Sequence, residues 1–245
     1  MVKIFRKVRQ EEVTENRFGN YSLYAIGEII LVVIGILIAL QIDNWNDERK
    51  DRSLENKIIK ELISNLTLDL VEIRDDISNM DSVNNSCDFI LNFFVTHEEP
   101  TEKFCHEVAK LKVNPHFDPN TSGYSLLQSN GVEIILNDSL RRAISVLYES
   151  NYPYYRRYET EHEQFKIQQI NPGLLEYFNW FIRPDLKFLG ILEISSSDFM
   201  KLKNDTSFIK LLHAIKFENS VVQNRAQRIE RSIIDVSGML KEELK

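Results

Sequence analysis

The sequence predicts an all-α protein with one N-terminal transmembrane helix followed by an extracytoplasmic helical bundle that contains long amphipathic helices. Three observations lead to this fold class: residues 21–42 are apolar over the length of a membrane span, basic residues gather before them, and apolar residues recur at steps of three and four after them. Such steps place apolar side chains on one face of a helix. We therefore expect a basic cytoplasmic or interfacial segment (1–20), a transmembrane helix (21–42) and an α-helical periplasmic domain (43–245).

The transmembrane helix is expected from length and composition. A hydrocarbon core about 30 Å thick needs about 20 apolar residues, and the run from Ile29 to Leu40 is unbroken, with Glu28 as the single charge nearby. An apolar residue contributes about −0.3 to −0.6 kcal/mol to insertion, whereas a central charge costs about 2.5–3.5 kcal/mol. The many Ile, Leu and Val residues therefore outweigh Glu28. The residues around Ala39 form no small-x-small cleavage site, so we expect an uncleaved anchor.

The flanking charges predict the orientation. Residues 1–20 carry a net charge of +2, whereas the other flank opens with Asp43, Asp47 and Glu48. Lys and Arg near a span favour the cytoplasmic side. We expect a single-pass protein of the bacterial inner membrane, with its N-terminus in the cytoplasm and its C-terminal domain in the periplasm.

One narrow face of the span is distinctive. At 100° per residue, small residues and the one carboxylate fall together, at Ala25, Glu28, Val32, Gly35 and Ala39. Small residues let helices approach closely, and a carboxylate in a membrane usually faces protein. We predict that this face packs against a transmembrane helix of a second copy or of a partner. The alternative is that Glu28 reaches the inner interface and the small residues are incidental.

The segment YAIGEIILVVIGILIALQIDNWNDERK resembles the N-terminal signature of a bacterial family of single-span membrane proteins of unknown function, which has an anchor of the form GEIxLVxxGIxIALQIxxWN. The resemblance covers roughly residues 1–52, and a looser pattern follows at Tyr124–Gly131 and Leu140-Arg141-Arg142. It implies a membrane location and a helical domain, and it implies no activity. The matching residues are Gly27, Glu28, Gly35, Ala39, Gln41, Asn44, Trp45 and Asn46.

The first half of the body predicts one long helix and several short ones. Apolar residues from Leu54 to Met80 form a stripe, and the intervening Lys, Glu, Asp and Asn residues are expected on a solvated face. No Gly or Pro lies between Ala39 and Glu99, so this helix is free to continue from the anchor. A short helix is expected at 101–113, a loop at 114–123, and a further helix at 124–130 with Gly131 as its cap.

The second half predicts a kinked helix and a second long one. A helix starts near Asp138, is kinked or restarted by Pro153, and ends at Asn171-Pro172-Gly173. Residues 174–182 are expected as a short helix. Residues 183–198 are mixed in pattern, with an extended stretch at 188–194 as one option. A long apolar stripe from Phe208 to Leu240 predicts the last helix, so the long elements form a bundle.

Few residues suggest chemistry. Glu159 and His162 form Glu-x-x-His, but di-iron bundles need two such motifs and further glutamates, so we interpret them as a solvated acidic face. Glu102, Cys105 and His106 lack a second cluster and predict no metal site. No nucleophile elbow, H-E-x-x-H, paired C-x-x-C or P-loop occurs. We therefore expect no enzyme, no catalytic residues, no cofactor and no metal.

Two further features leave alternatives open. Five tyrosines surround Arg156 and Arg157, and we favour a packed helix kink over an aromatic-cation binding surface. Cys87 and Cys105 lie on either side of a turn signal, and we favour two reduced buried thiols over a disulfide. The tyrosines are Tyr148, Tyr152, Tyr154, Tyr155 and Tyr158.

These features predict a structural or interaction protein, a scaffold or accessory subunit of an envelope complex or a homo-oligomer. Its expected partners are the lipid bilayer and a second copy or another membrane or envelope protein. Apart from residues 1–20 and Glu28, the chain carries a net charge of −8, which argues against a nucleic-acid partner. The alternatives are a proton-coupled, stator-like subunit that uses Glu28, and a ligand-sensing helical bundle.

Overall fold

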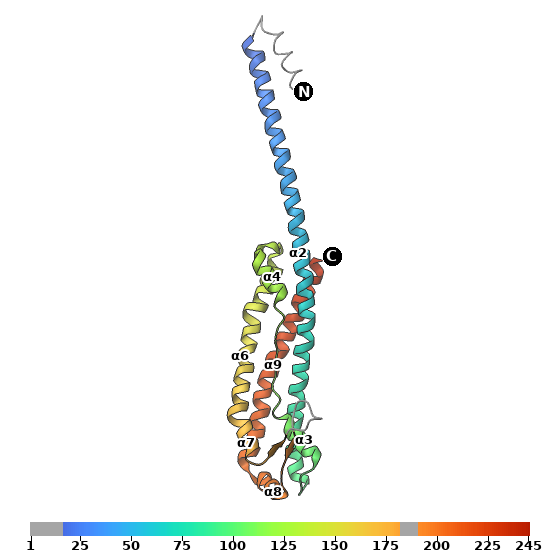
Figure 1. The fold of residues 1–245 in the computed structure, drawn as a ribbon, viewed down its shortest axis with the longest axis vertical. Helices are drawn as coiled ribbons and strands as arrows, with labels where there is room; N and C mark the ends of the chain where they lie inside the picture. The colour runs from blue at the N-terminus through green and yellow to red at the C-terminus, as the bar shows by residue number, and fades with distance from the viewer. Residues whose placement is uncertain (1–16, 182–190) are drawn as a thin grey trace. The chain divides into compact units, whose positions relative to one another are not determined.

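The computed structural model describes residues 17–181 and 191–245 (Figure 1). The chain divides into two compact units, Met1–Leu54 and Glu55–Lys245, and each is described by itself. Most of the predicted basic segment 1–20 therefore lies outside the described residues. The described part is mostly helical, which confirms the all-α prediction at that level.

The longest element is α2 (Arg17–Thr96), an uninterrupted α-helix of 80 residues. Its continuity confirms the expectation drawn from the absence of Gly and Pro between Ala39 and Glu99. The helix ends before Pro100, which cannot supply a backbone N–H to continue it. Thr101 then caps the next helix, α3 (Glu102–Lys110), because its hydroxyl accepts a hydrogen bond from the Phe104 N–H at 3.2 Å.

Short elements follow along one edge of the second unit. They are α4 (Ser122–Asn130), the 3₁₀ turn η1 (Val132–Ile134) and α5 (Asp138–Val146). Gly131 links the first two with a φ of 89°, a conformation that favours glycine. Asn137 caps α5 by accepting hydrogen bonds from the N–H groups of Ser139 and Leu140.

The predicted kinked helix is longer than expected. It comprises α5, the π-helix η2 (Leu147–Asn151), α6 (Tyr152–Phe165), the π-helix η3 (Lys166–Ile170) and α7 (Asn171–Leu175). The prediction that Asn171-Pro172-Gly173 ends the helix is wrong. Both Pro153 and Pro172 lie in the first turn after a π-helix, where the hydrogen-bond register changes and a missing N–H disrupts less.

The prediction of a short helix at 174–182 is also wrong beyond Leu175. Residues Asn179–Phe181 form β1, which pairs antiparallel with β2 (Ile191–Glu193), so that Trp180 faces Leu192 in register. Aromatic and β-branched residues favour strands, and this short hairpin is the one sheet in the described residues. It precedes α8 (Ser196–Asn204) and the long α9 (Thr206–Glu243).

Three long helices form the body of the second unit (Figure 1). Ion pairs and a hydrogen bond join α2 to α9 at Arg74–Glu230, Asp81–Gln223 and Asp88–Lys216. Their order shows that the two helices run antiparallel. The guanidinium of Arg225 on α9 lies 4.9 Å from the Tyr158 ring on α6, and Ser232 accepts a hydrogen bond from Asn151. Hence α9 is also antiparallel to α6.

An aromatic cluster fills the end of this unit where α3, α8 and the hairpin meet. The Phe104 ring lies 4.8 Å from Phe93 and 5.3 Å from Phe199, and all three side chains are buried. Buried aromatic pairs of this kind stabilise a core beyond the area that they bury. The cluster fixes the point from which residues 113–121 leave α3.

Candidate functional site

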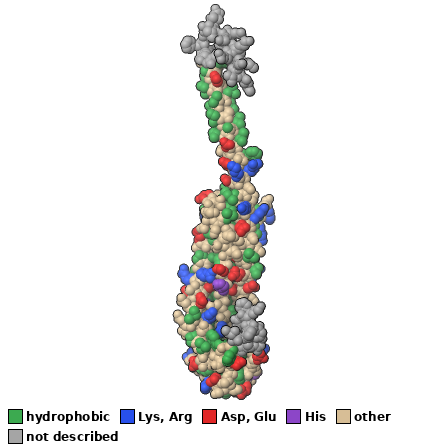
Figure 2. Space-filling model, in the orientation of Figure 1, with side chains coloured by type: hydrophobic (Ala, Val, Ile, Leu, Met, Phe, Trp, Pro, Cys, Tyr) green, Lys and Arg blue, Asp and Glu red, His purple; other side chains and the backbone are tan. Residues whose placement is uncertain are grey.

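The apolar part of α2 lies in the first unit and has the composition of a membrane span or a signal anchor. Among the described residues, α2 is the one helix long and apolar enough to cross a membrane, and none of its apolar stretch is buried within the chain. Figure 2 shows hydrophobic side chains along the face of this segment that is in view. The large apolar side chains from Leu23 to Ile42 are about half exposed or more.

The predicted packing face lies on this segment. Nothing in the described chain lies within 4 Å of a Cβ added at Gly35 or at Gly27, and Glu28 makes no hydrogen bond or ion pair to a described residue. At Gly35 and Glu28, the predicted face of Ala25, Glu28, Val32, Gly35 and Ala39 thus has no partner among the described residues. Its role in packing stays a prediction.

The second unit holds an extended strap, residues 113–121, which adopts neither helix nor strand. Its backbone N–H groups are bound by side chains instead. His116 donates to both oxygens of Asp76 at 3.0–3.1 Å, Asp118 to Glu72 at 3.1 Å, and Asn120 to Asp69 at 2.8 Å. These three carboxylates all belong to α2.

The intervening residue faces the other helix. The Phe117 N–H donates to Oε1 of Glu159 on α6 at 2.7 Å. Two residues of extended chain advance about 6.6 Å, whereas three or four residues of helix advance about 4.5–6 Å. An acceptor at every third or fourth position of α2 therefore meets every second N–H of the strap, which runs antiparallel to α2. We call Asp69, Glu72, Asp76 and Glu159 the carboxylate ladder.

The carboxylate ladder is largely buried, and the sequence-based expectation of a solvated polar face on α2 is wrong here. Asp69 is 0 % exposed and Asp76 5 %. Burial raises the pKa of Asp76 to about 6, against the lowering effect of the His116 N–H bond. Burial also raises the pKa of Asp69, although Asn120 and Tyr152 donate hydrogen bonds to it. Buried backbone N–H groups need acceptors, which explains why acids occupy this face.

The Glu-x-x-His motif is also buried, so its interpretation as a solvated acidic face is wrong. Glu159 is 6 % exposed and His162 is 3 % exposed. Burial raises the pKa of Glu159 to about 7, and its Oε2 has no hydrogen-bond partner, with Nε of Arg156 at 3.8 Å. The structure uses Glu159 to hold the strap. No group of three or more His, Cys, Asp or Glu side chains in the described ranges is arranged to hold a metal.

The tyrosine cluster surrounds the π-helix η2. Tyr148, Tyr152 and Tyr155 are buried, and the Tyr152 hydroxyl donates to Oδ2 of Asp69 at 2.8 Å. This matches the favoured interpretation as a packed helix kink. On the outer side, Arg156 pairs with Asp118 of the strap at 2.9 Å. The cluster therefore supports the strap from the α6 side.

Both cysteines are free thiols, as expected. Cys87 is buried and Cys105 is half-buried, so burial is complete for only one of them. Burial raises the pKa of Cys87 to about 12, and it raises the pKa of Cys105 as well. Neither thiol is poised to act as a thiolate nucleophile.

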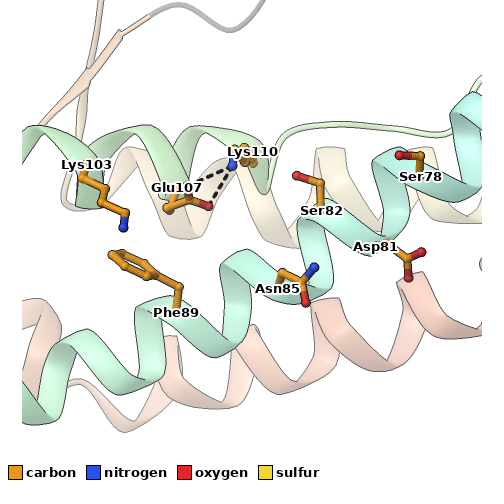
Figure 3. A pocket seen from close by; sticks show the side chains of 8 residues that line it. All are labelled: Ser78, Asp81, Ser82, Asn85, Phe89, Lys103, Glu107 and Lys110. Carbon is orange, nitrogen blue, oxygen red and sulfur yellow. Dashed lines mark hydrogen bonds and ion pairs between the residues drawn. The ribbon is translucent and has the colours of Figure 1, made fainter.

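A shallow groove of about 520 Å³ lies between α2 and α3 (Figure 3). Within it, Glu107 accepts hydrogen bonds from Lys110 at 2.9 Å and from the buried Ser86 at 2.6 Å, and Lys103 lies 5.0 Å from the Phe89 ring. Glu107 and Lys110 thus pair with each other, while Asp81 accepts a hydrogen bond from Gln223 of α9. The groove presents no convergent set of reactive groups. The groove is lined by Ser78, Asp81, Ser82, Asn85, Phe89, Lys103, Glu107 and Lys110.

Comparison with known proteins places the chain in a family. Searches of curated proteins and of solved structures returned no match. One family model, described as a family of unknown function (DUF6090), matches residues 28–220, which include most of the apolar segment and most of the second unit. The resemblance to a family of unknown function is confirmed at this level. The chain therefore belongs to the DUF6090 family.

Proposed function

We propose that this protein is a single-span membrane protein of the bacterial inner membrane that acts as a structural or interaction subunit. Its N-terminus lies in the cytoplasm, and its helical domain lies in the periplasm. It assembles through the face of Ala25, Glu28, Val32, Gly35 and Ala39, with a second copy or with another envelope protein.

The observation that carries this proposal is the uncovered apolar segment of α2. Fourteen large apolar side chains between Leu23 and Ile42, all exposed among the described residues, are too costly to leave in water. A bilayer covers them and leaves only the face with Gly35 and Ala39 suited to close helix contact. Glu28 lacks a partner within the described chain, which supports a contact with a second helix.

The body supports a structural role in a different way. Its buried carboxylates hold a backbone segment in place, and each charged residue of its groove has a partner within the second unit. Such groups maintain a fixed surface. A rigid helical domain on a membrane tether suits the presentation of that surface to other proteins.

The location and orientation have a direct test. Sodium carbonate extraction should leave the full chain in the membrane fraction, and a reporter fused after Lys245 should be active only if it is periplasmic. A chain that stays soluble without detergent contradicts the anchor. A cytosolic reporter contradicts the orientation while leaving the anchor intact.

The packing face has a matched test. Blue-native electrophoresis of the detergent-extracted chain should show an oligomer or a complex, and Gly35→Ile should reduce it because the added side chain separates the helices. Gly27→Ile is the control, since Gly27 lies on the same segment but outside the predicted face. A monomeric wild-type chain, or equal effects of both variants, would contradict assembly through this face.

A proton-coupled, stator-like role is a second candidate, and one observation favours it. Glu28 is the only acidic residue between Ser22 and Ile42. In this case Glu28→Gln should abolish proton uptake by proteoliposomes that contain the native complex, while insertion and assembly persist. Unchanged proton uptake, or none in the wild type, removes this candidate.

A further inference from the structure

A group of nitrogen donors gathers where the strap leaves α3. Lys112 precedes the strap, Lys166 begins η3, and Trp180 lies in β1. The Lys112 ammonium lies 3.9 Å from the centroid of the Trp180 ring. His162 of α6 lies four residues, about one helical turn, before Lys166 of η3. Val113, Phe165 and Trp180 pack against the same aromatic core, which brings the three segments together.

These donors have no acceptors among residues 17–181 and 191–245. Neither Lys112 nor Lys166 forms an ion pair or a hydrogen bond there, although most other half-buried cations of the second unit have a carboxylate partner. The indole Nε1 of Trp180 and Nδ1 of His162 are buried and have no hydrogen-bond partner. His162 is 3 % exposed as a whole side chain. A buried indole N–H normally has an acceptor, so the unpaired Trp180 Nε1 beside two unpaired ammonium groups indicates an acceptor that the described residues do not supply.

The pKa shifts of the basic groups agree with this shortage of acceptors. Burial and the neighbouring Lys166 lower the pKa of Lys112, and the same two causes lower the pKa of His162 to about 4. Burial lowers the pKa of Lys166, against the opposing effect of Glu163. Positive charge in this place is therefore only partly balanced by the described residues.

We propose that Lys112, Lys166, Trp180 and His162 form a binding site for a small oxyanion of the phosphate class, either free or as the anionic group of a larger molecule. A phosphate group offers several acceptor oxygens and up to two negative charges. Its oxygens can accept hydrogen bonds from ammonium groups and from an indole N–H. The Lys112–Trp180 stacking holds one ammonium in position before the anion arrives.

The two tryptophans of the chain give a specific readout. The full chain, labelled with ¹⁵N-tryptophan and held in an uncharged detergent, is titrated with inorganic phosphate at constant ionic strength, with chloride as the balancing salt. The indole N–H signal of Trp180 should move and saturate in the millimolar range or below, at roughly 1 mM or less. The signal of Trp45, in the apolar helix, should stay in place.

Variants separate the site from general effects. Lys112→Met and Lys166→Met should each raise the apparent Kd about tenfold or more, because each removes a charge-assisted hydrogen bond. Lys60→Met removes an exposed lysine of α2 and should leave the Kd within about twofold. A far-ultraviolet circular dichroism spectrum and a melting temperature equal to those of the wild type show that a variant is folded, so that a lost response reports binding.

The outcomes are distinct. A phosphate response that Lys112→Met and Lys166→Met leave intact overturns the proposal, as does equal movement of both indole signals or no movement at all. A second titration with glycerol 3-phosphate identifies the source of the anion. A lower Kd for the ester than for inorganic phosphate assigns the site to a larger molecule, and an equal or higher Kd assigns it to the free anion.

Discussion

Removal of the Asp69 carboxylate should strongly destabilise the second unit. Asp69 is fully buried and accepts three hydrogen bonds at 2.8 Å, from the backbone and side-chain nitrogens of Asn120 and from the Tyr152 hydroxyl. Hydrogen bonds to charged groups contribute about 1.5–3 kcal/mol each. Asp69→Ala loses all three but also removes the desolvation cost of a buried carboxylate, which is several kcal/mol. We expect a net loss of about 3–5 kcal/mol, a large part of the roughly 5–15 kcal/mol that stabilises a domain.

A graded series separates the hydrogen bonds from the packing. Asp69→Asn keeps the shape and one acceptor oxygen, so it should cost only about 1–2 kcal/mol. Asp75→Ala lies on the same helix but is exposed, and it should change the free energy of unfolding by less than about 0.5 kcal/mol. In a double-mutant cycle, Asp69→Ala and Tyr152→Phe should couple by about 1 kcal/mol or more.

The assay is urea unfolding of the full chain in detergent, followed by circular dichroism, with the midpoint and slope compared across variants. Equal midpoints for Asp69→Ala and Asp75→Ala would show that the ladder contributes nothing to stability. A coupling near zero would show that the Tyr152–Asp69 bond is not an energetic contact. The first result would refute the explanation of why acids occupy the buried face of α2.

Three further predictions follow from other positions. Gly123→Ala should lower the free energy of unfolding by about 1–3 kcal/mol, because a Cβ there would lie 2.9 Å from the Leu62 backbone nitrogen. Gly238→Ala should raise it by up to about 1 kcal/mol, because nothing lies within 4 Å of a Cβ at this helical position. Thermal melts that rank the two variants otherwise contradict this. Glu159 has a folded-state pKa of about 7, above its unfolded value, so its contribution to stability is lost as pH rises through 7. On going from pH 8 to pH 4.5, the free energy of unfolding should rise by about 2–3 kcal/mol less in Glu159→Gln than in the wild type. Parallel pH profiles of unfolding for the two proteins would refute this. Dithiothreitol should leave the melting temperature unchanged, and a maleimide should modify Cys105 before Cys87 in the folded chain; a mass 2 Da higher after reduction would reveal a disulfide instead.

The long helices were readable from the sequence because their periodicity is local. Apolar steps of three and four from Leu54 to Met80 and from Phe208 to Leu240 mark α2 and α9, and the caps at Thr101 and Asn137 are close to predicted helix starts. The extended option at 188–194 includes β2, but β1 and its pairing with β2 were missed because each strand has only three residues. Such pairing depends on tertiary contacts that no local pattern reports.

The carboxylate ladder was missed for a different reason. Asp69, Glu72 and Asp76 recur at steps of three and four, a pattern that also describes an ordinary solvated helix face. Only the position of residues 113–121 shows that their partners are backbone N–H groups. A signal was present in the loop itself, since a segment of nine residues without regular structure must satisfy its N–H groups elsewhere. The cation group around Trp180 joins three segments and leaves no trace in any one of them.

The alternation along the strap ties its length to the turns of its neighbours. Phe117 donates to α6, while His116 and Asp118 on either side donate to α2. Inserting or deleting a single residue here would exchange the two sets of donors, so that every later N–H would point at the wrong helix. Surface connections usually tolerate such changes. Residues 114–120 should not, because the spacing of their N–H groups must match the turns of α2 and α6.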